Sequence, residues 1–152
     1  QIAGEMEAPP IHHLLGVRPR AAEDGRATFV LPCSPWLSTS MRSVQGGFTA
    51  MLAELAMTGA FFTTTDPGVA VAPLDLKVNL LRPVMPDMRD LTAEAEIVHR
   101  GRTISIATCR VTNADGKPVA LATGSGMYLP GRPASLVGVE QLGSSDAEEP
   151  GA

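Results

Sequence analysis

The chain has 152 residues and a mass of 15.9 kDa, a length typical of a single domain. Hydrophobic residues make up 44% and charged residues 18% of the sequence, which is enough apolar material for a core and excludes global disorder. The 12 basic and 16 acidic residues give a net charge of −4, and no Lys/Arg cluster has interleaved aromatic residues. The composition therefore argues against a nucleic-acid-binding protein and against binding to anionic membranes.

Two features of the sequence indicate the cellular compartment of the protein: its two cysteines and its longest stretch poor in charge. Cys33 and Cys109 are far apart and lack the CxxC spacing of a zinc or redox site, so we expect reduced thiols in a cytoplasmic protein. Residues 43–65 are poor in charge, but Glu54 stands at their centre, where a lipid bilayer would penalise the carboxylate heavily. We therefore expect a buried helix there and no membrane span.

The two ends of the chain lack hydrophobic periodicity. Residues 1–10 mix acids, glycine and two prolines, and residues 131–152 end in GSSDAEEPGA. We expect a disordered N-terminal segment and a flexible C-terminal tail at these positions. The folded domain is expected to span residues 11–130.

The first half of this domain predicts two short strands and one helix. Residues 14–18 and 26–31 are strand-like and flank a turn with the Asp-Gly pair 24–25. Residues 44–62 follow the helical period and are apolar nearly all round, so we expect a helix enclosed on several sides, as when a sheet wraps a single helix. Gly59 is expected to mark the exit from the helix.

Four strand-like segments follow, at residues 74–80, 91–97, 103–112 and 119–129. In the first two, apolar and polar residues alternate, so each has one core face. The last two flank the sequence Asn-Ala-Asp-Gly at residues 113–116, which suits a hairpin. Because no helix separates these strands, they are predicted to be antiparallel neighbours. The sequence thus predicts an α+β fold, with one long antiparallel sheet wrapped around a central helix.

Residues 45–59, QGGFTAMLAELAMTG, combine a glycine-rich helix start with a single acid. Gly46 and Gly47 lack a Cβ, so a ligand can approach the backbone, and the first N–H groups of a helix lie at the positive end of its dipole. Such a start can hold a phosphate or polarise a carbonyl oxygen. Glu54 follows nine positions after Gln45, and desolvation among Met, Leu and Ala would strengthen it as a base.

Plainer interpretations of these residues remain open, because the two glycines could simply make a tight helix entry and Glu54 could form a structural ion pair with Arg or Lys. A joint catalytic role would require two chains. At about 1.5 Å per residue, Gly46 and Glu54 of one helix lie roughly 12 Å apart, too far to act on one small group. Two antiparallel helices in a symmetric dimer can instead bring the start of one to the middle of the other.

The ordered set of motifs resembles a known family. The run GGFTAMLAE in a helix, LLRP at residues 80–83, HRGR at residues 99–102 and the hairpin around NADGKPVALATG are together similar to the hotdog-fold acyl-CoA thioesterases of the phenylacetate-pathway type. The match covers residues 11–129. The resemblance implies a hotdog fold and a homodimer whose two sheets join into one, often paired again as a dimer of dimers. It places the thioester sites at the dimer interface.

The resemblance also implies catalytic roles. In that family an acid nine positions after the residue before Gly-Gly is the nucleophile or general base, which assigns this role to Glu54. The amide of the first glycine, here Gly46, polarises the thioester carbonyl. Some members with Glu carry a Thr one turn later that helps place the water or the acid, and Thr58 occupies that position. Its hydroxyl could equally bond back to its own helix.

Residues next to the thioester differ from those of many relatives. Gln45 stands where many have His, Thr39 where many have Asn or Gln, and Pro73 near a position that is Ser in some relatives. Gln can donate and accept a hydrogen bond but does not act as an acid or base near neutral pH. Together with Gly47, we expect Gln45 and Thr39 to border the substrate.

Coenzyme A brings phosphates, which arginine suits through its planar donor fork. Arg82 and the turn formed by Arg100, Gly101 and Arg102 are expected to contact these phosphates, with exposed solubilising charges as the alternative. Trp36 could cover the acyl group or could plug the core.

The resulting hypothesis is hydrolysis of an acyl-CoA thioester to free acid and coenzyme A. Glu54 either activates water or attacks the carbonyl, and the Gly46 amide of the partner helix stabilises the oxyanion. We expect no cofactor, since coenzyme A is part of the substrate, and no metal, since His12 and His13 have no Cys or carboxylate at ligand spacing. The alternatives are a non-catalytic acyl-CoA binding module and a hydratase or dehydratase. The latter would need a catalytic His, and His12, His13 and His99 are not placed for it.

Overall fold

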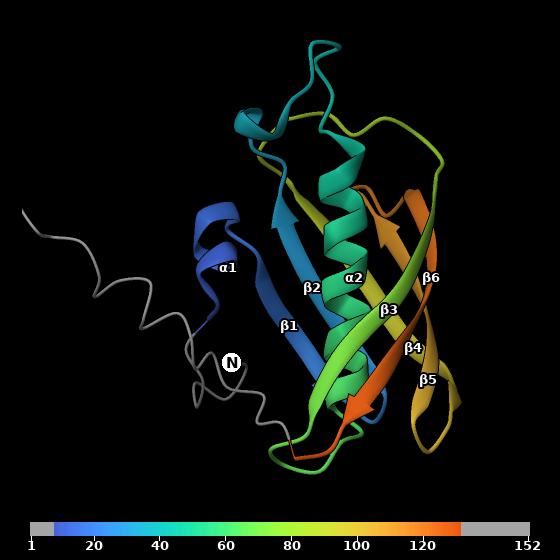
Figure 1. Ribbon diagram of the computed structural model, residues 1–152. Coiled ribbons are helices and arrows are strands. Elements are labelled where there is room, and N and C mark those ends of the chain that lie inside the picture. Colours follow the sequence, from blue (N-terminus) through green and yellow to red (C-terminus); the bar gives the residue numbers. More distant parts are fainter. Residues whose placement is uncertain (1–7, 132–152) are drawn as a thin grey trace, which may run out of the picture.

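The computed structural model describes residues 8–131, which form one sheet and one long helix (Figure 1). In chain order the elements are α1 (Pro10–Leu15), β1 (Arg18–Glu23), β2 (Arg26–Pro32), the 3-10 helix η1 (Pro35–Leu37), α2 (Gly46–Phe62), β3 (Ala70–Leu80), β4 (Asp90–Arg100), β5 (Ile104–Thr112) and β6 (Pro118–Leu129). Residues 1–7 of the predicted N-terminal segment and 132–152 of the predicted tail lie outside the described residues.

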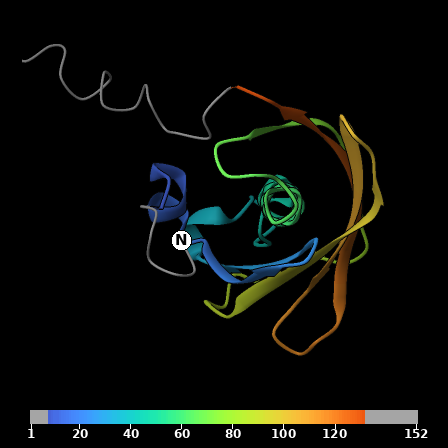
Figure 2. The same cartoon turned by 90° about the horizontal axis from the view of Figure 1, so that it is seen from below.

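The strands form a single 6-stranded sheet in the order β1-β2-β4-β5-β6-β3. Every neighbouring pair is antiparallel. Figure 2, viewed along the helix, shows the strands curling around α2 on most sides, and α2 contacts all of them. The predicted α+β architecture, a long antiparallel sheet around a central helix, is confirmed.

The core lies between the inner face of the sheet and the covered side of α2. The covered helix residues are mostly small, so the strands approach the helix closely, and Ala53, Ala56 and Ala60 each have 0% exposure. Alternate residues of β4 and β5 point into the core, as their period-two patterns predict. Of these inner residues, Leu91 and Val111 are the largest that are fully buried. Removal of this apolar surface from water is the main term that stabilises the fold.

The start of the domain differs from the prediction. Residues 14–18, expected to be a strand, form the end of α1 and the turn into β1. Pro10 in the first turn and Gly16 in the left-handed conformation (φ 73°) delimit a helix of 6 residues, too short to show a helical period. His12 on this helix is 5% exposed and packs edge-on against Phe29, with ring centroids 6.1 Å apart. Residue 12 therefore belongs to the core.

The end of α2 also differs from the prediction. Gly59 does not mark the exit, because α2 continues to Phe62. The glycine reflects close packing: a Cβ at this position would lie 2.7 Å from Cε2 of Phe29 on β2. The end of the helix is instead held by hydroxyl groups that donate to carbonyls three residues earlier, those of Thr63, Thr64 and Thr65.

β3 is an edge strand, and its position leaves part of the predicted core face open. Leu76 and Leu80 pair with the buried inner residues Gly124 and Ala120 of β6, so they lie on the helix side of the sheet as predicted. They are nevertheless 37% and 56% exposed, because β3 has a strand on one side only. An edge strand presents backbone N–H and C=O groups that can pair with another chain. In the described part of the chain, no helix is long and apolar enough to cross a bilayer.

Candidate active site

One stripe of α2 is left open by the sheet, and Glu54 lies in its middle. Gly47, Met51, Glu54, Thr58 and Phe62 recur every three or four residues, so they share one face of the helix. All are half-buried or exposed, as are the neighbouring Phe48, Leu55 and Gly59. The helix residues buried in the core are Thr49, Leu52, Ala53, Ala56, Met57, Ala60 and Phe61. The helix is enclosed on several sides as predicted, and this stripe is the exception. Glu54 is therefore accessible from outside the subunit.

Glu54 takes part in none of the ion pairs found within residues 8–131. These ion pairs all lie away from α2 and are Arg18–Asp90, Arg20–Asp90, Arg26–Glu96, Arg89–Asp87 and Arg89–Asp115. The alternative of a structural ion pair within the subunit is therefore wrong for the described residues. An unpaired carboxylate surrounded by apolar helix residues is available to a ligand or to a second subunit.

Thr58 lies one turn after Glu54 on the same stripe. Its hydroxyl makes no hydrogen bond within the described part of the subunit, whereas Thr63 and Thr64 at the helix end do bond back to carbonyl oxygens. The alternative that Thr58 is engaged by its own helix is therefore wrong here. The hydroxyl can hold a water molecule or a substrate atom beside the carboxylate.

The start of α2 packs tightly against β3. A Cβ at Gly46 would overlap Cδ1 of Leu80, so a larger residue there would have to displace the end of this side chain, and the tight entry considered above is present. Gly47 is exposed, and a Cβ added there would meet nothing closer than Gln45 Cγ at 3.9 Å. Gln45 is the N-cap residue, but its side chain does not cap the helix. The first amides of α2 therefore keep the positive end of the helix dipole available to a ligand.

The loop before α2 is fixed to its surroundings by backbone hydrogen bonds. Gln45 N donates to Leu37 O at 2.8 Å, and Val44 N donates to Val84 O at 2.9 Å, which ties this loop to the loop between β3 and β4. These bonds hold η1 beside the start of α2.

This loop contains Thr39, which was predicted to border the substrate, and Trp36, which was predicted either to cover the acyl group or to plug the core. Thr39 Oγ1 accepts a hydrogen bond from Met41 N at 3.2 Å, so the residue expected to border the substrate also holds the loop tip. Trp36 is 95% exposed, so the alternative that it plugs the core is wrong.

The predicted phosphate-binding arginines lie at the two ends of α2. Arg82 follows β3, whose last residue packs against the start of the helix. Arg100 donates from its guanidinium to Thr64 O at 2.5 Å, just beyond the end of the helix. Gly101 and Arg102 continue from Arg100 into the turn before β5. Because α2 has 17 residues and is about 25 Å long, one subunit does not bring Arg82 and the 100–102 turn to a single phosphate.

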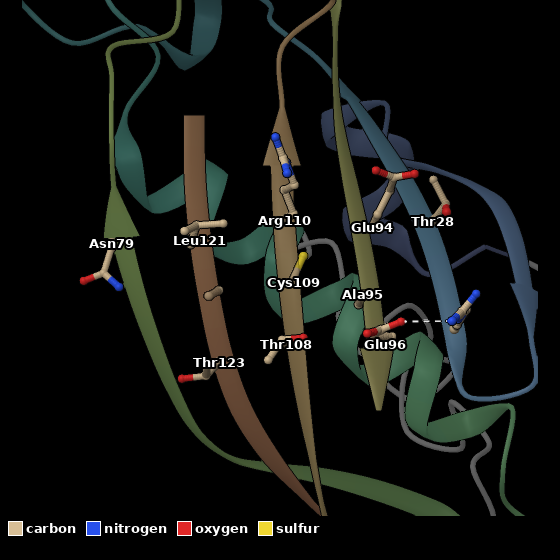
Figure 3. A pocket seen from close by; sticks show the side chains of 12 residues that line it. Thr28, Asn79, Glu94, Ala95, Glu96, Thr108, Cys109, Arg110, Leu121 and Thr123 are labelled. Atoms are coloured by element: carbon tan, nitrogen blue, oxygen red, sulfur yellow. Dashed lines mark ion pairs between the residues drawn. The ribbon is translucent and has the colours of Figure 1, made fainter. Parts of the chain in front are cut away.

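A cavity of about 670 Å³ lies on the outer face of the sheet, away from α2 (Figure 3). It is lined mainly by polar side chains, including Glu94 paired across strands with Arg110, and by the Arg26–Glu96 ion pair at 3.2 Å. None of the predicted site residues lines this cavity. Its carboxylates face arginines, so it lacks the unpaired acid of the α2 stripe, where we place the candidate active site.

Sequence reasoning did not single out Met51 and Phe62, which flank Glu54 on the open stripe. The signal that identifies them is their helical spacing from the acid. Within residues 8–131 no group of three His, Cys, Asp or Glu side chains is arranged to hold a metal ion.

An antiparallel sheet curled around one helix, with a carboxylate at the middle of the open helix face, is the arrangement of a hotdog-fold hydrolase. The chain belongs to the thioesterase superfamily, whose family model matches residues 42–120. The match includes the last residues of the loop before α2, all of α2, strands β3 to β5 and the first residues of β6.

Similar proteins agree with this assignment. A protein of Halobacterium salinarum named "Putative esterase VNG_1336C" is 32% identical over 123 residues, which cover 75% of this chain and 80% of that protein. A crystal structure of a mutant of thioesterase PA1618 from Pseudomonas aeruginosa superposes with a TM-score of 0.72 and 28% identity, over 79% of this chain and 86% of that one. The PaaI protein of the E. coli phenylacetic acid degradation operon shares the fold, with a TM-score of 0.75 and 23% identity over 82% and 87% of the two chains.

The resemblance seen in the sequence is thus confirmed, as is the hotdog fold that it implied. Membership of this family supports a hydrolase that acts on thioesters.

Proposed function

We propose that this protein is a homodimeric acyl-CoA thioesterase, which hydrolyses an acyl-CoA thioester to the free acid and coenzyme A. The observation that carries the proposal is Glu54. It is a carboxylate with no ion-pair partner among residues 8–131, and it lies at the middle of the open stripe of a helix whose uncapped start begins with Gly46. These are the two groups that thioester hydrolysis needs, a base or nucleophile and an oxyanion donor.

The exposed apolar surface supports the dimer. The stripe ends in Phe62, which is 40% exposed, and the neighbouring edge strand adds Leu76 and Leu80 at 37% and 56%. In the proposed dimer the two β3 edges pair and the two α2 stripes face each other in antiparallel directions. This arrangement buries the apolar surface and brings the partner's Gly46 level with Glu54. Pairing of two such dimers is part of the proposal.

In the general-base route, Glu54 takes a proton from a water molecule held by Thr58, and the water oxygen bonds to the thioester carbon. The amide of the partner's Gly46 donates to the carbonyl oxygen as it becomes an oxyanion. The C–S bond then breaks, and the sulfur leaves with the proton that Glu54 returns. In the nucleophilic route, a carboxylate oxygen of Glu54 bonds to the thioester carbon and the C–S bond breaks, so that coenzyme A leaves as a thiolate, which takes a proton from water. A second water molecule then hydrolyses the mixed anhydride to the free acid and restores the Glu54 carboxylate. Neither route needs a cofactor.

The remaining predicted residues have substrate-binding roles in this proposal. Gln45, Gly47 and Thr39 border the thioester, and the phosphates of coenzyme A lie near Arg82 of one subunit and the 100–102 turn of the other. An antiparallel helix pair makes such sharing possible, although the two groups are far apart in one chain. Cytoplasmic location is part of the proposal, and the free buried thiols Cys33 and Cys109 support a reducing compartment.

Release of free thiol from a panel of acyl-CoAs, measured with a thiol reagent, tests the function. Glu54→Gln is expected to lower kcat at least about 30-fold, corresponding to about 2 kcal/mol of barrier, while the fold and the dimer are retained. Glu94→Gln on the outer face of the sheet is the matched control and retains activity. The acyl-CoA binding module would be the better description if wild type and Glu54→Gln both bind acyl-CoA and neither releases thiol.

Attack by the Glu54 carboxylate is tested by an isotope experiment. After a single turnover in ¹⁸O-labelled water, label in the Glu54 carboxylate with none in the product acid indicates attack by the carboxylate, followed by opening of the mixed anhydride at the Glu54 carbon. Label in the product acid alone is expected both from the general-base route and from an anhydride that water opens at the acyl carbon.

A further inference from the structure

The two most exposed large apolar side chains of the described residues stand in the loop before α2. Trp36 is 95% and Met41 86% exposed. Their exposure is imposed by a well-formed loop: Trp36 N donates to Ser34 Oγ at 3.3 Å, and a β-bridge joins Ser38 to Val44 at the base of the tip. Figure 1 shows this loop projecting beyond the start of α2, along the direction of the helix axis. Within one subunit, the hydrogen-bonded loop before α2 therefore keeps the side chains of Trp36 and Met41 exposed to solvent.

The proposed dimer determines what lies opposite this loop, and the inference rests on that proposal. If Glu54 is level with the partner's Gly46, the helix beyond Glu54 runs alongside whatever precedes Gly46 in the partner. What precedes it is the projecting loop. Phe62, eight positions after Glu54, lies about 12 Å further along the axis. The exposed Phe62 of one subunit and the exposed loop residues of the other therefore reach the same end of the interface.

We propose that Trp36 and Met41 of one subunit and Phe62 of the other form the wall of the acyl pocket, which makes the enzyme selective for acyl-CoAs with a long or bulky apolar acyl group. The thioester carbonyl is held beside Glu54, and the acyl chain runs from there along the helix on the inner side of the wall. The phosphates of coenzyme A, near Arg82 of one subunit and the 100–102 turn of the other, stay on its outer side. An acetyl group ends one carbon beyond the carbonyl and cannot reach it, whereas a longer chain replaces water against three apolar side chains. A Met thioether adapts to different acyl shapes. Arg42 follows Met41, so the outer rim of the wall carries a cation.

The chain carries its own probe for this proposal, because Trp36 is its single tryptophan. Full-length protein is titrated with thioether analogues of octanoyl-CoA and acetyl-CoA, which cannot be hydrolysed, and with coenzyme A alone, while calorimetry measures binding in parallel. The octanoyl analogue is expected to shift Trp36 emission to shorter wavelength with the same saturation curve as the heat. The acetyl analogue and coenzyme A are expected to bind without this shift.

Three outcomes of the titration would overturn the proposal. If coenzyme A alone gives the full shift, Trp36 meets the nucleotide end. If the octanoyl analogue binds without a shift, Trp36 does not line the acyl pocket. If the emission of the ligand-free protein is already at short wavelength and does not respond, the second subunit alone covers Trp36. Since the titration needs no turnover, it decides the matter even if no thioester is hydrolysed.

Kinetics provide the second test. Trp36→Ala and Met41→Ala are each expected to reduce the ratio of kcat/KM for octanoyl-CoA to that for acetyl-CoA about tenfold, as loss of apolar pocket contacts does. Met88→Ala is the control, because Met88 is 60% exposed on the neighbouring loop and lies outside the wall. An unchanged ratio in both loop variants contradicts the proposed wall. Absence of thiol release from every acyl-CoA would instead contradict the proposed function.

Discussion

Phe29 of β2 and Gly59 of α2 are in direct contact: a Cβ on Gly59 would lie 2.7 Å from Phe29 Cε2 and 3.1 Å from the Cβ of Ala27. The strand therefore touches the helix backbone at the residue next to Thr58. Thr58 and Glu54 are one turn apart and lie roughly 100° and 140° around the helix from this contact. The depth at which α2 sits in the sheet therefore sets how far both side chains project from the open stripe.

Gly59→Ala is expected to lower the free energy of unfolding by about 1–3 kcal/mol, because a methyl group would force apart a well-packed contact. This sign opposes the gain of about 1 kcal/mol that Ala brings to a helix interior. Gly47→Ala on the same helix is the matched control, because its added Cβ meets only Gln45 Cγ at 3.9 Å, and its stability is expected to stay unchanged or to rise. Urea unfolding measures both. Equal gains for the two variants would contradict the contact.

His12 packs on Phe29, and its pH response can be predicted. Burial lowers the pKa of His12 below its ordinary value of 6.5, and the nearby charge of His13 lowers the pKa further. His12 Nδ1 is buried and has no hydrogen-bond partner among the described residues. As the pH falls below about 6.5, the unfolded chain takes up a proton that the folded chain resists, so stability is lost on acidification.

His12→Leu is expected to remove this component, so the stability lost between about pH 7 and pH 5 becomes smaller than in wild type. The measurement is a series of urea unfolding curves over that pH range. His99→Leu, the same substitution at an exposed position of β4, is the control for a general effect of replacing histidine with leucine. A slope that is the same in wild type and His12→Leu would show that His12 titrates alike in the folded and unfolded chains.

The roles of Arg100 and Arg102, in stability and in phosphate binding, can be separated by experiment. The guanidinium of Arg100 donates to Thr64 O at the C-terminal end of α2, where a cation also interacts favourably with the helix dipole. Arg100→Ala is expected to lower the free energy of unfolding by about 0.5–1 kcal/mol. Arg102→Ala is expected to keep the stability and to raise KM for acyl-CoA. If Arg100→Ala raises KM by more than Arg102→Ala with no loss of stability, its main role is with phosphate.

Features with a local periodic signal were predictable from the sequence. The helix predicted over residues 44–62 is Gly46–Phe62, and the predicted strand of residues 103–112 is Ile104–Thr112. Both follow from repeats of 3.6 and 2 residues, which are visible in a short window. The shared face of Glu54 and Thr58 follows from the same helical period. The sequence therefore predicted that Glu54 and Thr58 share a helix face, but it did not single out Met51 and Phe62 on the same stripe.

Features that depend on distant residues were not predictable in this way. Gly59 was misread as a helix end because its partner, Phe29, is 30 positions away. The exposure of Leu76 follows from the place of β3 at the sheet edge, which the alternation along the strand does not indicate. The separation of Arg82 from Arg100 likewise depends on the length and direction of the helix between them. Local sequence patterns indicate where helices and strands form. Which faces of them stay exposed depends on the order of the strands in the sheet and on contacts between residues far apart in the sequence.

The dimer is tested most directly at β3. Leu76→Lys places a charge on the edge strand beside the open stripe, where the proposed interface would have to bury it, so we expect monomers and loss of thiol release together. Circular dichroism should show the folded subunit retained, because Leu76 is 37% exposed within it. Leu121→Lys is the matched control: Leu121 is 45% exposed on the outer face of the sheet, and the variant is expected to keep the β3 dimer and its activity. Light scattering measures the oligomeric state of both variants, and the thiol assay measures their hydrolysis of acyl-CoA. A monomeric Leu76→Lys that still hydrolyses thioesters would show that Glu54 works without the partner's Gly46, since the two groups of one helix are about 12 Å apart.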